Sequence, residues 1–166
     1  METWAYLWLA AVTGYLVLFL LRERKRSMEV RSMARRLGFS YIGNALPRSL
    51  TLHGTGLEGA SSIWNVLDRM CGATRVITFD CRIGSGKGSW RRTVIAAQGP
   101  RDVFGVAKFT SNLTLDRSGD WTMMYEPKTF SIVPPGLMPT AEIEAHLGAI
   151  GLLGPSLQGS AGSHNR

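Results

Sequence analysis

The sequence has 166 residues, of which 45% are hydrophobic and 19% charged, a composition typical of a chain with one globular domain. The formal net charge is +7. Seven basic and two acidic residues, a balance of +5, fall between residues 22 and 36, so the rest of the chain is close to neutral. A nucleic-acid-binding protein usually spreads its cations over the folded surface. This concentration of charge in one segment therefore argues against a nucleic-acid partner.

The N-terminal residues 4–21 contain no charged side chain and carry Trp and Tyr residues at their outer end. As a helix they would span roughly 27 Å, close to the hydrocarbon thickness of a bilayer. A cleaved signal peptide, the main alternative, has positive charge before the apolar run and a small-residue cleavage site after it. Here Glu2 precedes the run and a basic cluster follows it, Arg22-Glu23-Arg24-Lys25-Arg26. We therefore predict an uncleaved transmembrane helix.

The basic cluster also predicts the orientation, because Lys and Arg accumulate on the cytoplasmic side of a span. We expect a single-pass protein of the plasma membrane with its N-terminus outside and its C-terminal domain in the cytoplasm. Four cations would then lie at the membrane surface, where each attracts anionic headgroups by about 1 kcal/mol: Arg22, Arg24, Lys25 and Arg26. A solvated surface that only sets the topology is the simpler interpretation of the same residues.

The helix is expected to continue beyond the membrane. Apolar residues recur at the i, i+3, i+4, i+7 spacing of one helix face: Val30, Met33, Ala34 and Leu37. Gly38 then provides a helix terminator in the left-handed conformation. Residues 22–37 are therefore predicted to leave the bilayer as a basic helix and to pack this stripe against the domain.

A small domain is predicted over residues 39–150, followed by a polar tail, residues 151–166, that is expected to be disordered. The sequence predicts seven strands, in chain order at 39–42, 63–71, 74–83, 90–97, 103–109, 112–117 and 120–126. Between the first two strands, residues 43–60 are predicted to form a loop with a short helical turn. An irregular segment over 127–139 leads to a closing helix over 140–149. Strands in succession followed by a helix indicate an α+β fold with an antiparallel sheet.

The run Gly84-Ser85-Gly86-Lys87-Gly88 suggests a phosphate-binding loop, but the required pattern is absent. Cys81 occupies the position of the first glycine, Gly88 replaces the Ser or Thr that binds magnesium, and a strand rather than a helix follows. We interpret the run as a hairpin loop. The two cysteines, Cys71 and Cys81, have no metal-ligand spacing and are expected to be free thiols in strands. We predict no metal, no cofactor and no catalytic residue.

One polar cluster remains as a candidate site or partner surface: Asn65, Asp80, Arg82, Trp90 and Arg92. A hairpin centred on Gly86 would pair Asp80 with Arg92 as an ion pair and Arg82 with Trp90 as a cation–π contact. Asn65 on the preceding strand could join Asp80. Simple stabilisation of one sheet face is the alternative to a ligand or partner surface.

Several short motifs resemble a group of uncharacterised bacterial single-pass membrane proteins with an LGF…FDYR…GSGK…TV pattern. They are Leu37-Gly38-Phe39, Phe79-Asp80-Cys81-Arg82, Gly84-Ser85-Gly86-Lys87 and Thr93-Val94, with Cys81 in place of the aromatic residue. The resemblance implies a bacterial membrane protein and supplies no activity or site.

From these observations we expect a membrane-anchored accessory or interaction module rather than an enzyme. Its predicted partners are the lipid bilayer, anionic lipid headgroups and an unidentified protein. The alternative is a small-ligand-binding domain or an enzyme with an unrecognised site around Asp80, Arg82 and Arg92.

Overall fold

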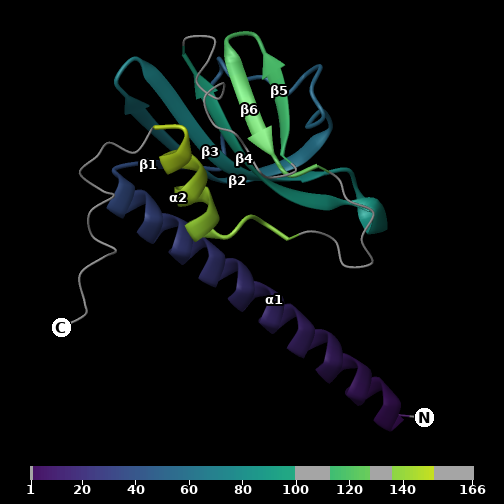
Figure 1. Ribbon diagram of the computed structural model, residues 1–166. Helices are drawn as coiled ribbons and strands as arrows, with labels where there is room; N and C mark the ends of the chain where they lie inside the picture. The colour runs from purple at the N-terminus through teal and green to yellow at the C-terminus, as the bar shows by residue number, and fades with distance from the viewer. Residues whose placement is uncertain (1, 100–112, 128–135, 152–166) are drawn as a thin grey trace, which may run out of the picture.

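The computed structural model describes residues 2–99, 113–127 and 136–151. Its first element is a continuous 36-residue helix, α1 (Glu2–Leu37), whose N-terminal half projects away from the domain (Figure 1). The helix ends as predicted: Gly38 has a φ of 71°, the Phe39 amide donates to the Ala34 carbonyl, and the Gly38 amide donates to the Arg35 carbonyl. This Schellman arrangement satisfies carbonyls that would otherwise lack partners.

In the part of the chain that the structure describes, six antiparallel strands form one sheet in the order β1-β2-β3-β4-β6-β5, and the α+β fold is confirmed. The strands are β1 (Ser40–Gly43), β2 (Ala60–Cys71), β3 (Thr74–Ile83), β4 (Trp90–Gln98), β5 (Thr114–Ser118) and β6 (Trp121–Tyr125). A short 3₁₀ turn, η1 (Gly86–Gly88), lies between β3 and β4, and α2 (Thr140–Ala149) follows the sheet as predicted. Gly119, with a φ of 58°, makes the expected tight turn between β5 and β6.

Some expected features differ or lie outside the described residues. The short helical turn predicted between β1 and β2 is absent from this described segment. It contains hydrogen-bonded turns instead, such as the one in which the Leu50 amide donates to the Pro47 carbonyl. The predicted strand over 103–109 and the tail from 152 onward fall outside the described residues, as does most of the irregular segment over 127–139.

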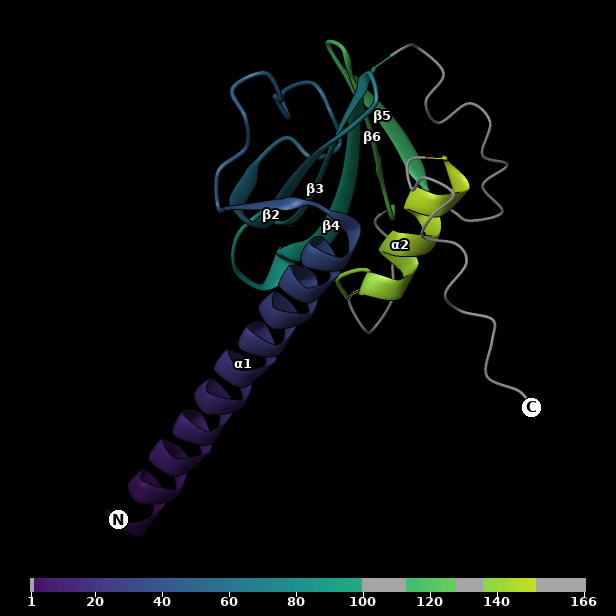
Figure 2. The same cartoon turned by 90° about the vertical axis from the view of Figure 1, so that its left-hand side faces the viewer.

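Both faces of the sheet are covered, as the edge-on view of Figure 2 shows. One face packs against α1 and α2 through a core whose described members include Met33, Leu37, Leu67, Ile95, Met124, Ile143 and Leu147. The other face packs against the loop between β1 and β2, through Leu50, Leu57, Ile77, Phe79, Val94, Trp121 and Met123. Of the polar even positions of β3, Thr78 and Asp80 are buried on the face that α1 covers, whereas Arg82 at the end of the strand is exposed.

The helix α1 packs on this face through the predicted stripe, since Val30, Met33, Ala34 and Leu37 are all buried. An ion pair between Arg36 and Glu144 links α1 to α2. Within the described residues α1 is the helix long and apolar enough to cross a membrane, and no residue of its most apolar window is buried inside the protein.

Candidate functional site

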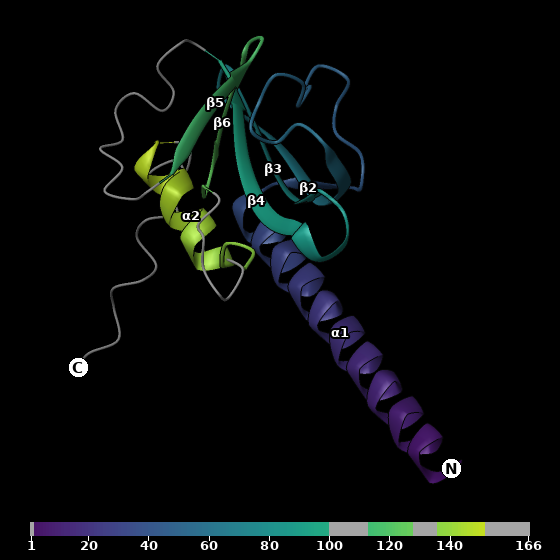
Figure 3. The same ribbon diagram turned by 90° about the vertical axis from the view of Figure 1, so that its right-hand side faces the viewer.

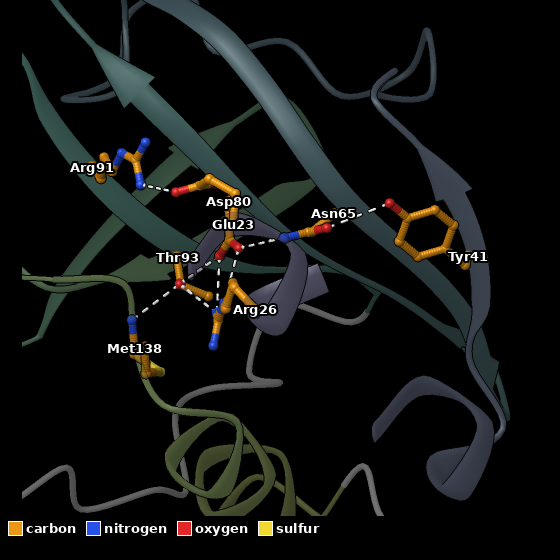
Figure 4. Close-up of polar contacts among 8 residues, drawn as sticks. All are labelled: Glu23, Arg26, Tyr41, Asn65, Asp80, Arg91, Thr93 and Met138. Atoms are coloured by element: carbon orange, nitrogen blue, oxygen red, sulfur yellow. Dashed lines mark hydrogen bonds and ion pairs between the residues drawn. The ribbon is translucent and has the colours of Figure 1, made fainter. Parts of the chain in front are cut away.

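A buried polar cluster joins α1 to the sheet, and Asp80 of β3 lies at its centre (Figure 4). The Arg26 guanidinium donates to both carboxylate oxygens, from Nε at 3.2 Å and from a terminal nitrogen at 3.1 Å. Asn65 donates to Asp80 at 3.0 Å and the Thr93 hydroxyl donates to it at 2.7 Å. The side chains of Arg26 and Asp80 are only 11% and 2% exposed, so this is a buried ion pair with its remaining lone pairs satisfied.

Local features of β2 and β4 position the side chains of Asn65 and Thr93 beside Asp80. Asn65 lies in a β-bulge, where the register between β2 and β3 shifts, and it has a φ of 54°, rare for a residue other than glycine. Its side chain also accepts a hydrogen bond from Tyr41 at 3.4 Å. Thr93 is directly opposite Asp80 in the β3–β4 pair, and its hydroxyl accepts the Met138 amide at 3.1 Å. The cluster therefore ties α1, the sheet and the segment before α2 together.

A second contact lies one helical turn closer to the N-terminus. Arg91 of β4 forms an ion pair with Glu23 of α1, drawn in Figure 4. The Arg91 guanidinium also lies 5.4 Å from the ring centroids of both Phe19 and Trp64. The domain is thus in contact with α1 from Phe19 onward, inside the C-terminal turn of the predicted membrane span.

The predicted pairing of the β3–β4 hairpin is wrong by one residue. Asp80 is opposite Thr93, and Arg92 is opposite Cys81 on the other face of the sheet. Arg82 is exposed and opposite Arg91, so neither the Asp80–Arg92 ion pair nor the Arg82–Trp90 cation–π contact forms. The reason is the turn: η1 makes the loop six residues long, and its centre falls between Gly86 and Lys87 rather than on Gly86.

Arg92 is 1% exposed and packs beside the loop-covered core instead. Its guanidinium lies 4.4 Å from the Trp90 ring centroid and donates to the carbonyls of Arg91, at 3.0 Å, and Pro127, at 2.8 Å. Burial lowers the pKa of Arg92, and the charge of Glu126 acts in the opposite direction. Of the predicted cluster, Asn65 therefore lies with Asp80, and Arg92 packs on Trp90 away from them.

The four cations predicted at the membrane surface divide into two groups. Arg22, Arg24 and Lys25 are exposed on α1, as a surface contact requires. Arg26 is not available for contact with lipid headgroups, because its side chain is turned into the domain and paired with Asp80. The signal for this was present in the sequence: Arg26 lies four residues before Val30 and seven before Met33, on the stripe that packs against the sheet.

A groove of about 760 Å³ opens beside these contacts, between α1, the end of the β3–β4 hairpin and residues 136–139. Figure 3 shows the hairpin end extending over the middle of α1. Aromatic and cationic side chains from both α1 and the β3–β4 hairpin line the groove, among them Tyr15, Phe19, Arg22, Lys25, Arg82 and Trp90. We call this feature the hairpin groove.

The two cysteines are free thiols in strands, as expected. Cys81 is buried, and desolvation raises its pKa from 9.0 to about 12, with a smaller contribution from the charge of Asp80. Cys71 is half-buried, and burial also raises its pKa. Over residues 2–99, 113–127 and 136–151 no group of three or more His, Cys, Asp or Glu side chains could hold a metal ion.

These thiols provide a test of the packing around β3. At pH 8, Cys81 in the folded full-length protein should react with iodoacetamide about a thousandfold more slowly than in the urea-unfolded chain, because its pKa is raised from 9.0 to about 12. Peptide mass spectrometry measures both rates, and Cys71 should react faster than Cys81. The free energy of unfolding should also fall as pH rises from 9 to 12, because the unfolded chain loses the proton first. Equal labelling rates for the two thiols would contradict this packing.

The chain matches no family model, no curated protein sequence and no solved structure. The resemblance to bacterial single-pass proteins therefore stays a prediction from short motifs.

Proposed function

We propose that this protein is a single-pass membrane-anchored accessory module whose domain is held rigidly on its own anchor helix, at the cytoplasmic surface of a bacterial plasma membrane. The observation that carries the proposal is that one continuous helix provides both the apolar segment, residues 4–21, and Arg26, which is buried against Asp80. An anchor joined by a flexible linker needs no such contact. A helix that is locked to the sheet sets the height and direction of the domain relative to the membrane.

The proposed rigidity rests on several contacts along one face of α1. The buried stripe packs against the sheet, the Glu23–Arg91 pair extends the contact toward the apolar segment, and Arg36 pairs with Glu144 of α2. Because the domain contacts α1 from Phe19 onward, it would lie directly against the lipid headgroups. A surface held in this way suits an accessory role beside a membrane partner.

A small-ligand site or an enzyme around Asp80, Arg82 and Arg92 is the other function suggested by the sequence. The described contacts do not join these three side chains into one site. Asp80 is occupied by Arg26, Asn65 and Thr93, Arg82 is exposed, and Arg92 lies across the sheet.

The anchoring is tested by extraction of the full-length protein expressed in a bacterial host. We expect it to stay in the membrane pellet after alkaline carbonate treatment, which releases peripheral proteins, because the apolar segment is long enough to span the bilayer. A peripheral membrane protein of the host is the internal control. Release into the supernatant would contradict the anchor.

The orientation is tested separately with reporters fused after Arg166. Alkaline phosphatase, which is active only outside the cytoplasm, should stay inactive, and a fluorescent protein that folds in the cytoplasm should be bright, because Arg22 to Arg26 favour the cytoplasmic side. The opposite pair of results would place the domain outside.

A further inference from the structure

We infer that the hairpin groove is a binding site for an anionic glycerophospholipid, with its phosphate on Arg22 and Arg82 and an acyl chain along Tyr15 and Phe19. This inference rests on the proposed membrane anchor and deepens it by naming a ligand. It differs from a general attraction of the basic helix to lipids, because Arg82 comes from the β3–β4 hairpin and a defined groove joins it to α1.

The charge of the groove favours an anion. Among the described residues, five cationic side chains and two carboxylates line it: Arg22, Lys25, Arg26, Arg82 and Arg91, with Glu23 and Glu29. Arg26 is paired with Asp80, Arg91 with Glu23, and Lys25 lies 4.0 Å from Glu29. In the part of the chain that the structure describes, no carboxylate forms an ion pair with Arg22 or Arg82, and both are exposed. Two cations are therefore available to an incoming phosphate, which arginine binds in a planar, bidentate manner.

The position and shape of the groove favour a lipid over a water-soluble anion. Tyr15 and Phe19 belong to the predicted span, where they would face acyl chains, and Arg22 follows at its end. The groove therefore runs from apolar side chains at the membrane level to cations at the headgroup level, which matches an amphiphile with an anionic head. Its volume, about 760 Å³, lies within the range of about 300–1,000 Å³ typical of sites for small molecules.

The test measures the lipid that copurifies with the full-length protein. The protein is incubated in detergent micelles with equimolar phosphatidylglycerol and phosphatidylcholine, separated by size exclusion, and its retained lipids are quantified by mass spectrometry. We expect the wild-type protein to retain phosphatidylglycerol selectively. The double variant Arg22→Gln/Arg82→Gln should lower this selectivity by about fivefold for each arginine removed.

The matched control is Arg35→Gln/Arg48→Gln, which also removes one exposed arginine from α1 and one from the domain but none from the groove or from the predicted membrane-surface cations. It should retain the wild-type selectivity. A second variant blocks the groove without changing its charge. Gly136 lines the groove, and no atom of the described residues lies within 4 Å of a Cβ added to it, so Gly136→Trp should displace the lipid and Gly136→Ala should not.

An equal loss of selectivity in both arginine pairs would overturn the inference in favour of a diffuse basic surface. Absence of selectivity in the wild type, or crosslinking of the groove to a protein segment that excludes lipid, would also overturn it. Failure of the anchor itself is recognised separately, because the wild-type protein would then be released by carbonate. A protein that resists carbonate but shows no lipid selectivity contradicts only the lipid site.

Discussion

Replacing Asp80 with asparagine is expected to lower the free energy of unfolding by about 3–5 kcal/mol. Asp80→Asn leaves the Arg26 guanidinium, which is 11% exposed, without a compensating negative charge. It also weakens the hydrogen bonds that Asn65 and Thr93 donate to the carboxylate. Urea unfolding of the full-length protein in mild detergent, followed by tryptophan fluorescence, measures the change. Trp121 is buried and reports on loss of the domain core.

The matched control is Asp120→Asn, which changes the same side chain at an exposed position between β5 and β6 and should alter stability by no more than about 0.5 kcal/mol. A loss below about 1 kcal/mol for Asp80→Asn would show that the pair is solvated rather than buried. The double variant Arg26→Met/Asp80→Asn should be more stable than Asp80→Asn alone, because it removes the unpaired charge. Additive losses would contradict this coupling.

Met33→Ala on α1 is expected to destabilise the docked state by about 2–5 kcal/mol. Met33 is 1% exposed and contributes to the core between α1, the sheet and α2, so its truncation removes apolar contacts and leaves a cavity. The same urea titration measures the loss. Hydrogen exchange should become faster over residues 26–37, because the C-terminal half of α1 would detach from the sheet more often.

Met28→Ala is the control for this change on the same helix. Met28 is 64% exposed, so its truncation should change stability by no more than about 0.5 kcal/mol. Equal effects of the two substitutions would show that α1 is not packed on the domain through the Met33 face, and the proposed rigid anchor would be lost with it.

Much of the architecture could be predicted because it depends on local signals. The apolar run, the stripe from Val30 to Leu37 and the terminating Gly38 are enough to predict α1 as one long helix. The alternation in β3 and the glycine between β5 and β6 predict strands and a turn, since both follow from residues close together in the chain.

The candidate site was predicted only in part, because it depends on register and on which elements cover each sheet face. One additional residue in the β3–β4 loop moves Arg92 to the opposite face from Asp80, and loop composition alone does not distinguish five residues from six. Asparagine tolerates the positive φ of the β-bulge at Asn65, but its presence alone does not predict a bulge that directs this side chain at Asp80.

The amino-acid sequence by itself determined the apolar N-terminal helix, its continuation to Leu37 and the succession of the described strands along the chain. These features could be predicted because periodicity and turn residues act over a few positions. Only the tertiary structure decided the partner of Asp80. The helical spacing places Arg26 on the packing stripe of α1, but it does not indicate which residue of the sheet lies beneath it. Arg26 and Asp80 became a buried ion pair because α1 crosses the polar face of the sheet, which brings together residues 54 positions apart.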